Sequence, residues 1–400
     1  MADTQNFAWS LLLAALVGLG ALVSYRLTRW LRVPAPALML VAAAVAVHAV
    51  PSMHVPPVLT VERLVTIALA FVLFEGGMGI GVSRLRSAGR GIVLVGVLGT
   101  FLTTLGVAVF MHVGVGLDWY PAALVATAVA PTDPAVVFSV LGQQEVEGRS
   151  GTVLEGESGA NDPVGIALMV SLVQAGGLSG GAARHVAGEF CVQMAVGLLV
   201  GVLGGVLLRR LVERSYLPDS GLQPLRTVAC VLLIFAAATL LHGSGFLAVF
   251  VAGVVMGEVR TPYRRELERV HAGLASMGEV VAFVVLGLTV PLAVLTKVDV
   301  WVPGLVLALV LAVVIRPLLV GPLLLGPGLS RPERWFVLLA GLKGAVPLLL
   351  GLFLLGADVS EPGRLYGIVV VVVLFSVAVQ GSLVPVMMRR FGIRTRVVAP

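Results

Sequence analysis

The stretch TVLEGESGANDPVGIALMVSLVQ, at residues 152–174, decides how the rest of the chain is interpreted. Its length suits a membrane-crossing helix, which needs about 20 apolar residues. It nevertheless carries Glu155, Glu157 and Asp162, with Pro163 immediately after. An ionisable side chain at bilayer depth is costly, so such residues usually occur where something charged binds or passes. The stretch therefore predicts a membrane helix that binds a charged ligand.

The polar residues of this stretch fall on two neighbouring stripes of the predicted helix. Ser158 and Asp162 are four residues apart and Glu155 and Asp162 are seven apart, so these three lie near one face. Glu157 and Asn161 form the neighbouring stripe. A carboxylate, a hydroxyl and an amide carbonyl together suit a small hard cation, which prefers oxygen ligands. Asp162 is the best-placed candidate.

The composition indicates a polytopic membrane protein. The chain has 400 residues, of which 58% are hydrophobic and 12% charged, whereas soluble domains carry roughly 25% charged residues. The net charge of +6 comes from basic residues in short connections between apolar runs, which is typical of membrane topology. We therefore expect a lipid bilayer as the partner, and no nucleic acid.

Apolar runs predict thirteen transmembrane spans in an all-α fold. The runs lie near residues 8–25, 33–50, 64–80, 91–116, 121–141, 152–174, 187–208, 225–241, 244–257, 272–296, 301–321, 335–356 and 365–388. The odd-numbered connections and the tail hold 21 basic residues, when Arg226 at the start of the eighth run is counted with the seventh connection, and the even-numbered connections hold four. The positive-inside rule then places the N-terminus outside and the C-terminus in the cytoplasm.

Two of the predicted spans are interrupted. In span five, at 121–141, two prolines flank Thr132 and Asp133, and each proline removes a helix hydrogen bond. Span twelve, at 335–356, repeats the interruption with two glycines and a proline around Lys343. We expect broken helices that cross near the membrane midplane, because half-helix ends carry partial charges that bind ions.

The two interrupted spans are seven crossings apart, which predicts inverted repeats. The expected organisation is a single transporter domain over residues 1–400, with no soluble regulatory domain. Residues 8–174 would form the first repeat, 187–211 a linker span and 225–390 the second repeat.

Several polar residues have both a structural and a functional interpretation. Asp162 either binds a cation or serves as a buried partner for one of two bases inside apolar runs, Arg316 and Lys343. Asp133 either caps a helix at the kink or helps to build the ion site. Glu75 is either an interfacial acid or an acid that faces the cation. We assign three residues to structural roles: Glu157 as the partner of Arg316, and Glu279 and His242 as packing or interface residues.

Five motifs together resemble those of the monovalent cation/proton antiporters, in the branch of bacterial sodium/proton exchangers and animal sodium/hydrogen exchangers. The motifs, in chain order, are LFEGGM (73–78), APTDPAVVF (130–138), GESGANDP (156–163), IRP (315–317) and GLKGAVP (341–347). The resemblance covers essentially the whole chain. Among subgroups, ESGxNDP with GAVP is most similar to the cell-volume-regulation potassium/proton antiporters, so the choice between Na⁺ and K⁺ stays open.

The resemblance implies roles for particular residues. It implies that Asp162 binds the proton and the cation alternately, with Ser158 as a further ligand. Asn161 stands where the electrogenic branch has a second aspartate, which implies electroneutral exchange. Thr132 and Asp133 would lie at the helix crossing.

The family resemblance also implies features beyond these ion-site residues. Glu75 matches an acid near the ion site, and Glu157 with Arg316 resembles the family's structural ion pair. Lys343 replaces the more usual arginine in this motif. From its place in the broken span, Lys343 either neutralises that span electrostatically, which we favour, or carries protons. The family likeness further suggests a homodimer in a bacterial inner or plasma membrane, without a cofactor.

The sequence thus predicts a secondary antiporter that exchanges protons for Na⁺ or K⁺, and not an enzyme. Asp162, Ser158 and Thr132 would hold the transported metal ion. Two alternatives stay open. Asp133 and Asp162 could form the carboxyl pair of an intramembrane aspartic protease, or the chain could be a cation channel without proton coupling.

Overall fold

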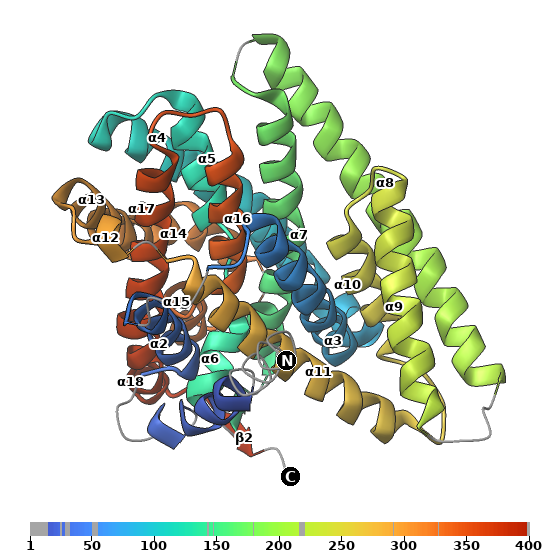
Figure 1. Cartoon of the computed structure of the whole chain (residues 1–400). Helices are drawn as coiled ribbons and strands as arrows, with labels where there is room; N and C mark the ends of the chain where they lie inside the picture. The colour runs from blue at the N-terminus through green and yellow to red at the C-terminus, as the bar shows by residue number, and fades with distance from the viewer. Residues whose placement is uncertain are drawn as a thin grey trace, which may run out of the picture.

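Apolar helices make up nearly all of the computed structural model (Figure 1). The structure describes residues 15–24, 26–28, 33–49, 55–141, 144–146, 148–178, 180–215, 221–290, 292–326 and 328–397. The predicted all-α class is confirmed over these residues. Two strands of three residues each, β1 (Gln144–Val146) and β2 (Thr395–Val397), pair antiparallel outside the helices.

Seven helical segments in the described part are long and apolar enough to cross a membrane. They are built from α3 (Val58–Ile92), η1 (Val93–Leu98) with α4 (Gly99–Val115), α8 (Gly180–Arg214), α9 (Leu222–Leu240), α11 (Arg264–Leu288), α13 (Val298–Val310) with η2 (Leu311–Ile315) and α14 (Arg316–Leu319), and α17 (Pro362–Phe375) with η4 (Ser376–Gln380) and α18 (Gly381–Phe391).

The remaining helices are shorter or carry more polar residues. They are a segment at residues 15–28 that includes the undescribed residue 25, α2 (Ala35–Ala49), α5 (Trp119–Val129), α6 (Pro134–Leu141), α7 (Gly148–Ala175), α10 (Gly245–Met256), α12 (Leu292–Leu295), η3 (Gly321–Leu325), α15 (Arg331–Leu339) and α16 (Ala345–Gly356). Each expected apolar run overlaps a helical segment, but residues 8–14 of the first run lie outside the described residues. The number of crossings, thirteen, stays a prediction.

Helix boundaries follow local sequence signals. Between α9 and α10, Ser244 accepts a hydrogen bond from the Leu247 backbone N–H at 3.2 Å and caps α10. Ser330 and Glu333 form a capping box at the start of α15, the expected signature of a helix start. The sequence predicted a connection after the third span, which ends at residue 80. Instead, α3 continues beyond it with a kink at Gly81, where φ is +63°.

The two predicted breaks are present and they meet. Residues 131–133 between α5 and α6 are not helical, and neither are residues 341–344 between α15 and α16. The Asp133 backbone N–H donates a hydrogen bond to the Leu342 carbonyl oxygen at 2.8 Å. The two broken segments therefore contact each other at their breaks. Whether the two halves of the chain are inverted repeats stays a prediction.

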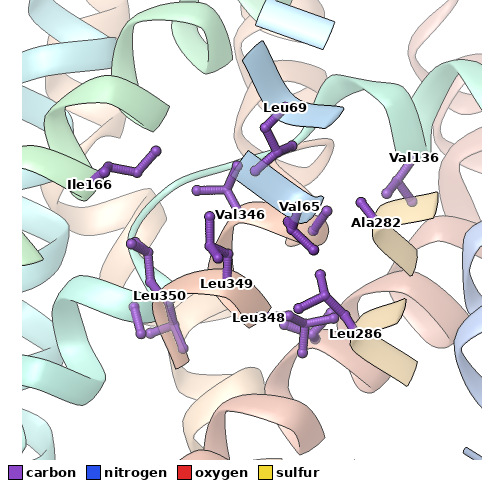
Figure 2. Packing of buried hydrophobic residues seen from close by; sticks show 14 of the residues in the cluster. Val65, Leu69, Val136, Ile166, Ala282, Leu286, Val346, Leu348, Leu349 and Leu350 are labelled. Carbon is purple, nitrogen blue, oxygen red and sulfur yellow. The ribbon is translucent and has the colours of Figure 1, made fainter. Parts of the chain in front are cut away.

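Buried apolar side chains surround this crossing. Figure 2 shows one cluster to which α3, α6, α7, α11 and α16 all contribute, with Val65, Leu69, Val136, Ile166, Ala282, Leu286, Val346, Leu348, Leu349 and Leu350. In Figure 1, α8 and α9 lie on one side of the molecule and α13 and α17 on the other, with α7 between them. The crossing thus lies inside the bundle, where broken helices are tolerated in a membrane because neighbouring protein satisfies their backbone groups.

Candidate functional site

Helix α7 brings the polar stretch into the interior of the bundle. Glu157, Ser158, Asn161 and Asp162 have exposed fractions of 1%, 2%, 2% and 6%. Its glycines allow close packing: a Cβ at Gly159 would collide with the Phe250 ring of α10. The sequence pattern of small and polar residues therefore places polar groups where α7 meets its neighbours.

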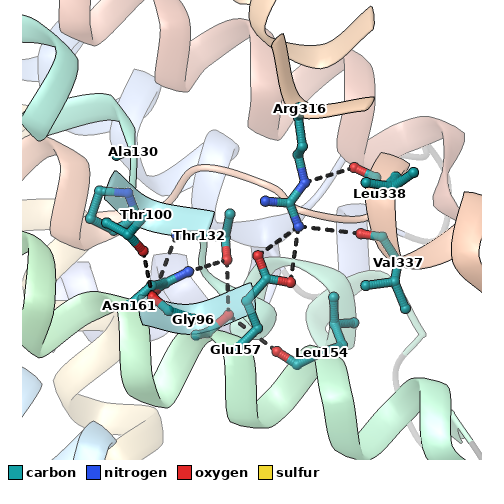
Figure 3. Close-up of polar contacts among 12 residues, drawn as sticks. Gly96, Thr100, Ala130, Thr132, Leu154, Glu157, Asn161, Arg316, Val337 and Leu338 are labelled. Carbon is teal, nitrogen blue, oxygen red and sulfur yellow. Dashed lines mark hydrogen bonds and ion pairs between the residues drawn. The ribbon is translucent and has the colours of Figure 1, made fainter. Parts of the chain in front are cut away.

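Three polar side chains on α7 and the α5–α6 break form one hydrogen-bonded group (Figure 3). The Asn161 side-chain amide donates to Thr132 Oγ1 at 2.7 Å, and its Oδ1 accepts from the Thr132 backbone N–H at 3.3 Å. The hydroxyls of Thr132 and Ser158 are 3.2 Å apart. The structure thus brings together three of the residues predicted for the ion site.

Asp162 lies one helical turn beyond Ser158 and differs from it in its contacts. Its Oδ1 atom is buried and has no hydrogen-bond partner among the described residues. The carboxyl group is within electrostatic range of Asp133 and of Lys343. A buried carboxyl oxygen without a partner is costly, and the cost is relieved by binding a proton or a cation. This atom is the strongest sign of a ligand at the predicted position.

Charged side chains at the crossing cap the broken helices reciprocally. Lys343 Nζ donates to the carbonyl oxygens of Ala130 at 2.8 Å and Pro131 at 3.0 Å, at the C-terminal end of α5. Asp133 Oδ2 accepts a hydrogen bond from the Ala345 backbone N–H at 3.2 Å, at the N-terminus of α16. A cation at a helix C-terminus and an anion at an N-terminus are both stabilising. Asp133 therefore caps the opposite broken helix.

Two glycines of the second break allow this close approach. A Cβ at Gly344 would collide with the Asp133 carboxylate, and a Cβ at Gly341 would collide with the Arg316 guanidinium. The sequence GLKG therefore combines the capping base with two positions that leave room for charged groups.

Glu157 and Arg316 form a buried ion pair next to this group (Figure 3). Arg316 Nη2 is 2.7 Å from Glu157 Oε1 and 2.9 Å from Oε2, with side-chain exposures of 3% and 2%. Arg316 Nε also donates to the Leu338 carbonyl oxygen at 2.9 Å, near the end of α15. Arg316 directly follows the π-helical segment η2, a local widening that is frequent at functional sites.

Two residues that support the second break, Gln380 and Ser376, were not predicted from the sequence. Gln380 donates to the Leu339 carbonyl oxygen at 2.7 Å, and Ser376 Oγ accepts from the Lys343 backbone N–H at 2.9 Å. Both belong to η4 and satisfy backbone groups freed by the α15–α16 break. Polar residues spaced four apart in an apolar span were the available signal, but nothing local relates them to residue 343.

The remaining predicted acids lie around this centre. Glu75 is half-buried on α3, which packs against both α7 and α10. Glu155 is half-buried on α7. Glu279 of α11, which we assigned to packing, has a buried Oε1 and interacts electrostatically with Asp133. His242 is exposed in the α9–α10 turn.

Discontinuous helices that meet beside a buried ion-binding group are an arrangement found in secondary transporters. The chain matches the family described as sodium/hydrogen exchanger, transmembrane, over residues 12–390. It belongs to that family, which bears out the resemblance seen in the sequence.

Curated relatives carry antiporter names. The chain is 33% identical over 322 residues to the K(+)/H(+) antiporter NhaP2 of Shewanella sp. (strain MR-4), over 79% of this chain and 55% of the relative. It is 34% identical over 331 residues to the K(+)/H(+) antiporter NhaP of Alkalimonas amylolytica, over 80% of this chain and 56% of the relative. The chain spans about half the length of these curated relatives.

One curated relative and one solved structure are named as sodium/proton antiporters. The Na(+)/H(+) antiporter NhaS2 of Synechocystis sp. (strain ATCC 27184 / PCC 6803 / Kazusa) is 29% identical over 259 residues, which are 64% of this chain and 45% of the relative. The structure of the sodium proton antiporter MjNhaP1 from Methanocaldococcus jannaschii at pH 8 gives a TM-score of 0.76 at 20% identity, covering 95% of this chain and 97% of that one. This likeness shows a shared fold.

Proposed function

We propose that this chain is a secondary active antiporter that exchanges protons for Na⁺ or K⁺ across a bacterial inner or plasma membrane. The observation that carries the proposal is the buried Oδ1 of Asp162, which has no hydrogen-bond partner in the described part of the chain and lies beside two crossed broken helices. The antiporter names of the relatives support it. We further propose that the protein is a homodimer with its N-terminus outside and its C-terminus in the cytoplasm.

The proposed cycle uses one carboxylate for both ions. Asp162 releases its proton and takes a dehydrated cation, with the oxygens of Thr132 and Ser158 as further ligands, since monovalent and divalent hard cations bind oxygen. The site then opens to the other side, where a proton displaces the cation. Asn161 adds no charge, because its amide is neutral. One proton therefore exchanges for one cation, and transport is electroneutral.

The protein parts around Asp162 have distinct roles in this proposal. Lys343 and Asp133 hold the ends of the broken helices, so that the site keeps its shape while empty. Arg316 neutralises Glu157, which leaves Asp162 as the acid that exchanges ions. The hydrogen bonds of Asn161 fix the position of the Thr132 hydroxyl.

Proton movement in proteoliposomes tests this function. Purified protein is reconstituted with a pH-sensitive dye inside the vesicles, and Na⁺, K⁺ or Li⁺ is added separately. We expect wild type to move protons against at least one of the cations and Asp162→Asn to move none. Cation flux without proton movement would instead identify a channel. Peptide cleavage that is lost in Asp162→Asn would identify a protease.

The pH dependence gives a second test of the same proposal. Because one carboxylate cannot hold both ions, a rising proton concentration displaces the cation, and exchange falls at acid pH once Asp162 stays protonated. An exchange rate that is flat across the pH range would contradict competition at a single site.

A further inference from the structure

Glu279 is an acidic side chain in the middle of α11 that the proposed cycle does not use. Its Oε1 atom is buried and has no hydrogen-bond partner in the described part of the chain. An ionisable residue inside a membrane helix is a candidate functional residue by default. The absence of a partner for Oε1 adds to this, because structural acids in apolar surroundings are normally hydrogen-bonded or paired.

The face of α11 that carries Glu279 is turned toward the helix crossing. Ala282 and Leu286 follow Glu279 by three and seven residues and so lie near the same face of the helix. Figure 2 shows both in the buried cluster that contains Val136 of α6 and Val346 of α16. Both of these half-helices start at a break, so the face of α11 that carries Glu279 packs near the crossing.

Asp133 links Glu279 to the proposed ion site. It lies within electrostatic range of Glu279 and also of Asp162. Its Oδ2 accepts the hydrogen bond from the Ala345 backbone N–H, which favours an ionised Asp133. The charges of two neighbouring carboxylates oppose each other unless a proton or a cation neutralises one of them. Glu279 therefore requires either a proton or a cation when Asp133 is ionised.

Among the described residues, no base forms an ion pair with Glu279. Helices α2, α3, α9 and α16 pack against α11. No titratable side chain occurs in α16, and the charged group with an electrostatic effect on Glu279 among the described residues is Asp133. The titratable residues of the other three helices are His48, Glu62, Arg63, Glu75, Arg84, Arg86, Arg90, Arg226 and Cys230.

We propose that Glu279 is a second ion-exchanging carboxyl, which with Asp133 forms a way station for the transported cation on its path to Asp162. This inference rests on the proposed antiport function and extends it. When a cation arrives, the O–H bond of the Glu279 carboxyl breaks and its proton leaves to water. The cation takes the place of the proton, so the charge of the pair is unchanged and nothing is oxidised or reduced.

Cation binding to the purified protein tests the proposal without requiring transport. Isothermal titration with Na⁺ and with K⁺ is carried out on wild type, Glu279→Gln, Glu279→Asp and Glu266→Gln at one alkaline and one acid pH. Glu266 is the matched control, since it is an exposed acid in the first turn of the same helix. Vesicle exchange with Asp162→Asn as the blank runs in parallel.

We expect Glu279→Gln to weaken cation binding at alkaline pH by about 10-fold, as loss of one charged contact does. Glu279→Asp should recover most of the affinity and Glu266→Gln should match wild type. Glu279→Gln binding as tightly as wild type would overturn the proposal even if exchange is normal. Wild type that binds but does not exchange would refute the antiport function and leave the binding role of Glu279 intact, whereas no binding by wild type would refute both.

Discussion

At the scale of single residues, Glu157 and Asp162 are two acids of α7 with different surroundings. Glu157 is buried in an ion pair with Arg316. Arg316 contacts both carboxylate oxygens of Glu157 and also donates to the Leu338 carbonyl oxygen. Asp162 has no comparable partner for its Oδ1 among the described residues. Two acids on one helix thus differ because one has a base within hydrogen-bond distance and the other does not.

Removing one partner of that pair should destabilise the fold. Glu157→Gln leaves the Arg316 guanidinium buried without its countercharge, which costs about 3–5 kcal/mol. Thermal unfolding in detergent measures the change. The double variant Glu157→Met with Arg316→Met should recover part of the loss, because a buried pair is replaceable by apolar residues of similar volume. A double variant less stable than either single variant would argue against this interpretation.

The sequence predicted these residues to different extents. Helical spacing brought Ser158 and Asp162 to one face, and the charges inside apolar runs, together with the family likeness, suggested the ion pair of Glu157 and Arg316. The capping of α16 by Asp133 was not predictable, because Asp133 and Ala345, from whose backbone N–H it accepts a hydrogen bond, are 212 positions apart in the chain. The electrostatic interaction of Glu279 with Asp133 was not predictable for the same reason, since Asp133 belongs to a distant segment. Local patterns identify polar residues in apolar helices, but only the fold identifies their partners.

At the scale of helices, Lys343 satisfies the carbonyl groups at the C-terminal end of α5, where the two broken helices cross. Lys343→Met leaves the carbonyl oxygens of Ala130 and Pro131 without their donor. We expect a loss of about 1–3 kcal/mol for each of these carbonyls, together with slower exchange. Lys343→Arg keeps the charge and the donors, so it should retain more stability than Lys343→Met. Equal stability of the two variants in thermal unfolding would show that the charge at this position is dispensable.

Helices α3 and α10 also pack closely, at Gly77 of α3. The adjacent Gly76 is not part of this contact. A Cβ at Gly77 would collide with the Phe250 carbonyl oxygen and lie 2.9 Å from the Val254 backbone N, whereas a Cβ at Gly76 meets nothing within 4 Å. We therefore expect Gly77→Ala to cost about 1–3 kcal/mol and Gly76→Ala to stay within about 0.5 kcal/mol of wild type. Thermal unfolding of both variants in the same detergent measures the difference, and equal melting temperatures would contradict the observed packing.

The breaks themselves were predictable from composition, while their support was not. Paired prolines and glycines inside apolar runs indicated where the helices end. The groups that satisfy the freed backbone come from η4, from α14 and from the opposite break. The kink at Gly81 within α3 was likewise missed, since a single glycine in a glycine-rich segment does not reveal which position adopts positive φ.

At the scale of the whole molecule, membrane orientation is the main untested expectation. Ser83 follows the α3 kink in the arginine-rich third connection, and Ser360 precedes α17 in the twelfth; both are exposed. With Cys191 and Cys230 replaced, a membrane-impermeant maleimide should label Ser360→Cys in intact cells and Ser83→Cys only after lysis. The reverse pattern would show that the chain is inverted in the membrane.

Antiport in this proposal depends on the Asp162 carboxylate, which exchanges a proton for a cation. The most direct measurement is the number of protons released into unbuffered solution per cation bound by purified protein. We predict that Na⁺ or K⁺ displaces protons from wild type as it binds, and that Asp162→Asn, verified as folded by its melting temperature, releases fewer protons than wild type at saturating cation, because the Asp162 carboxyl no longer takes part. Cation binding with unchanged proton release in Asp162→Asn would contradict the account.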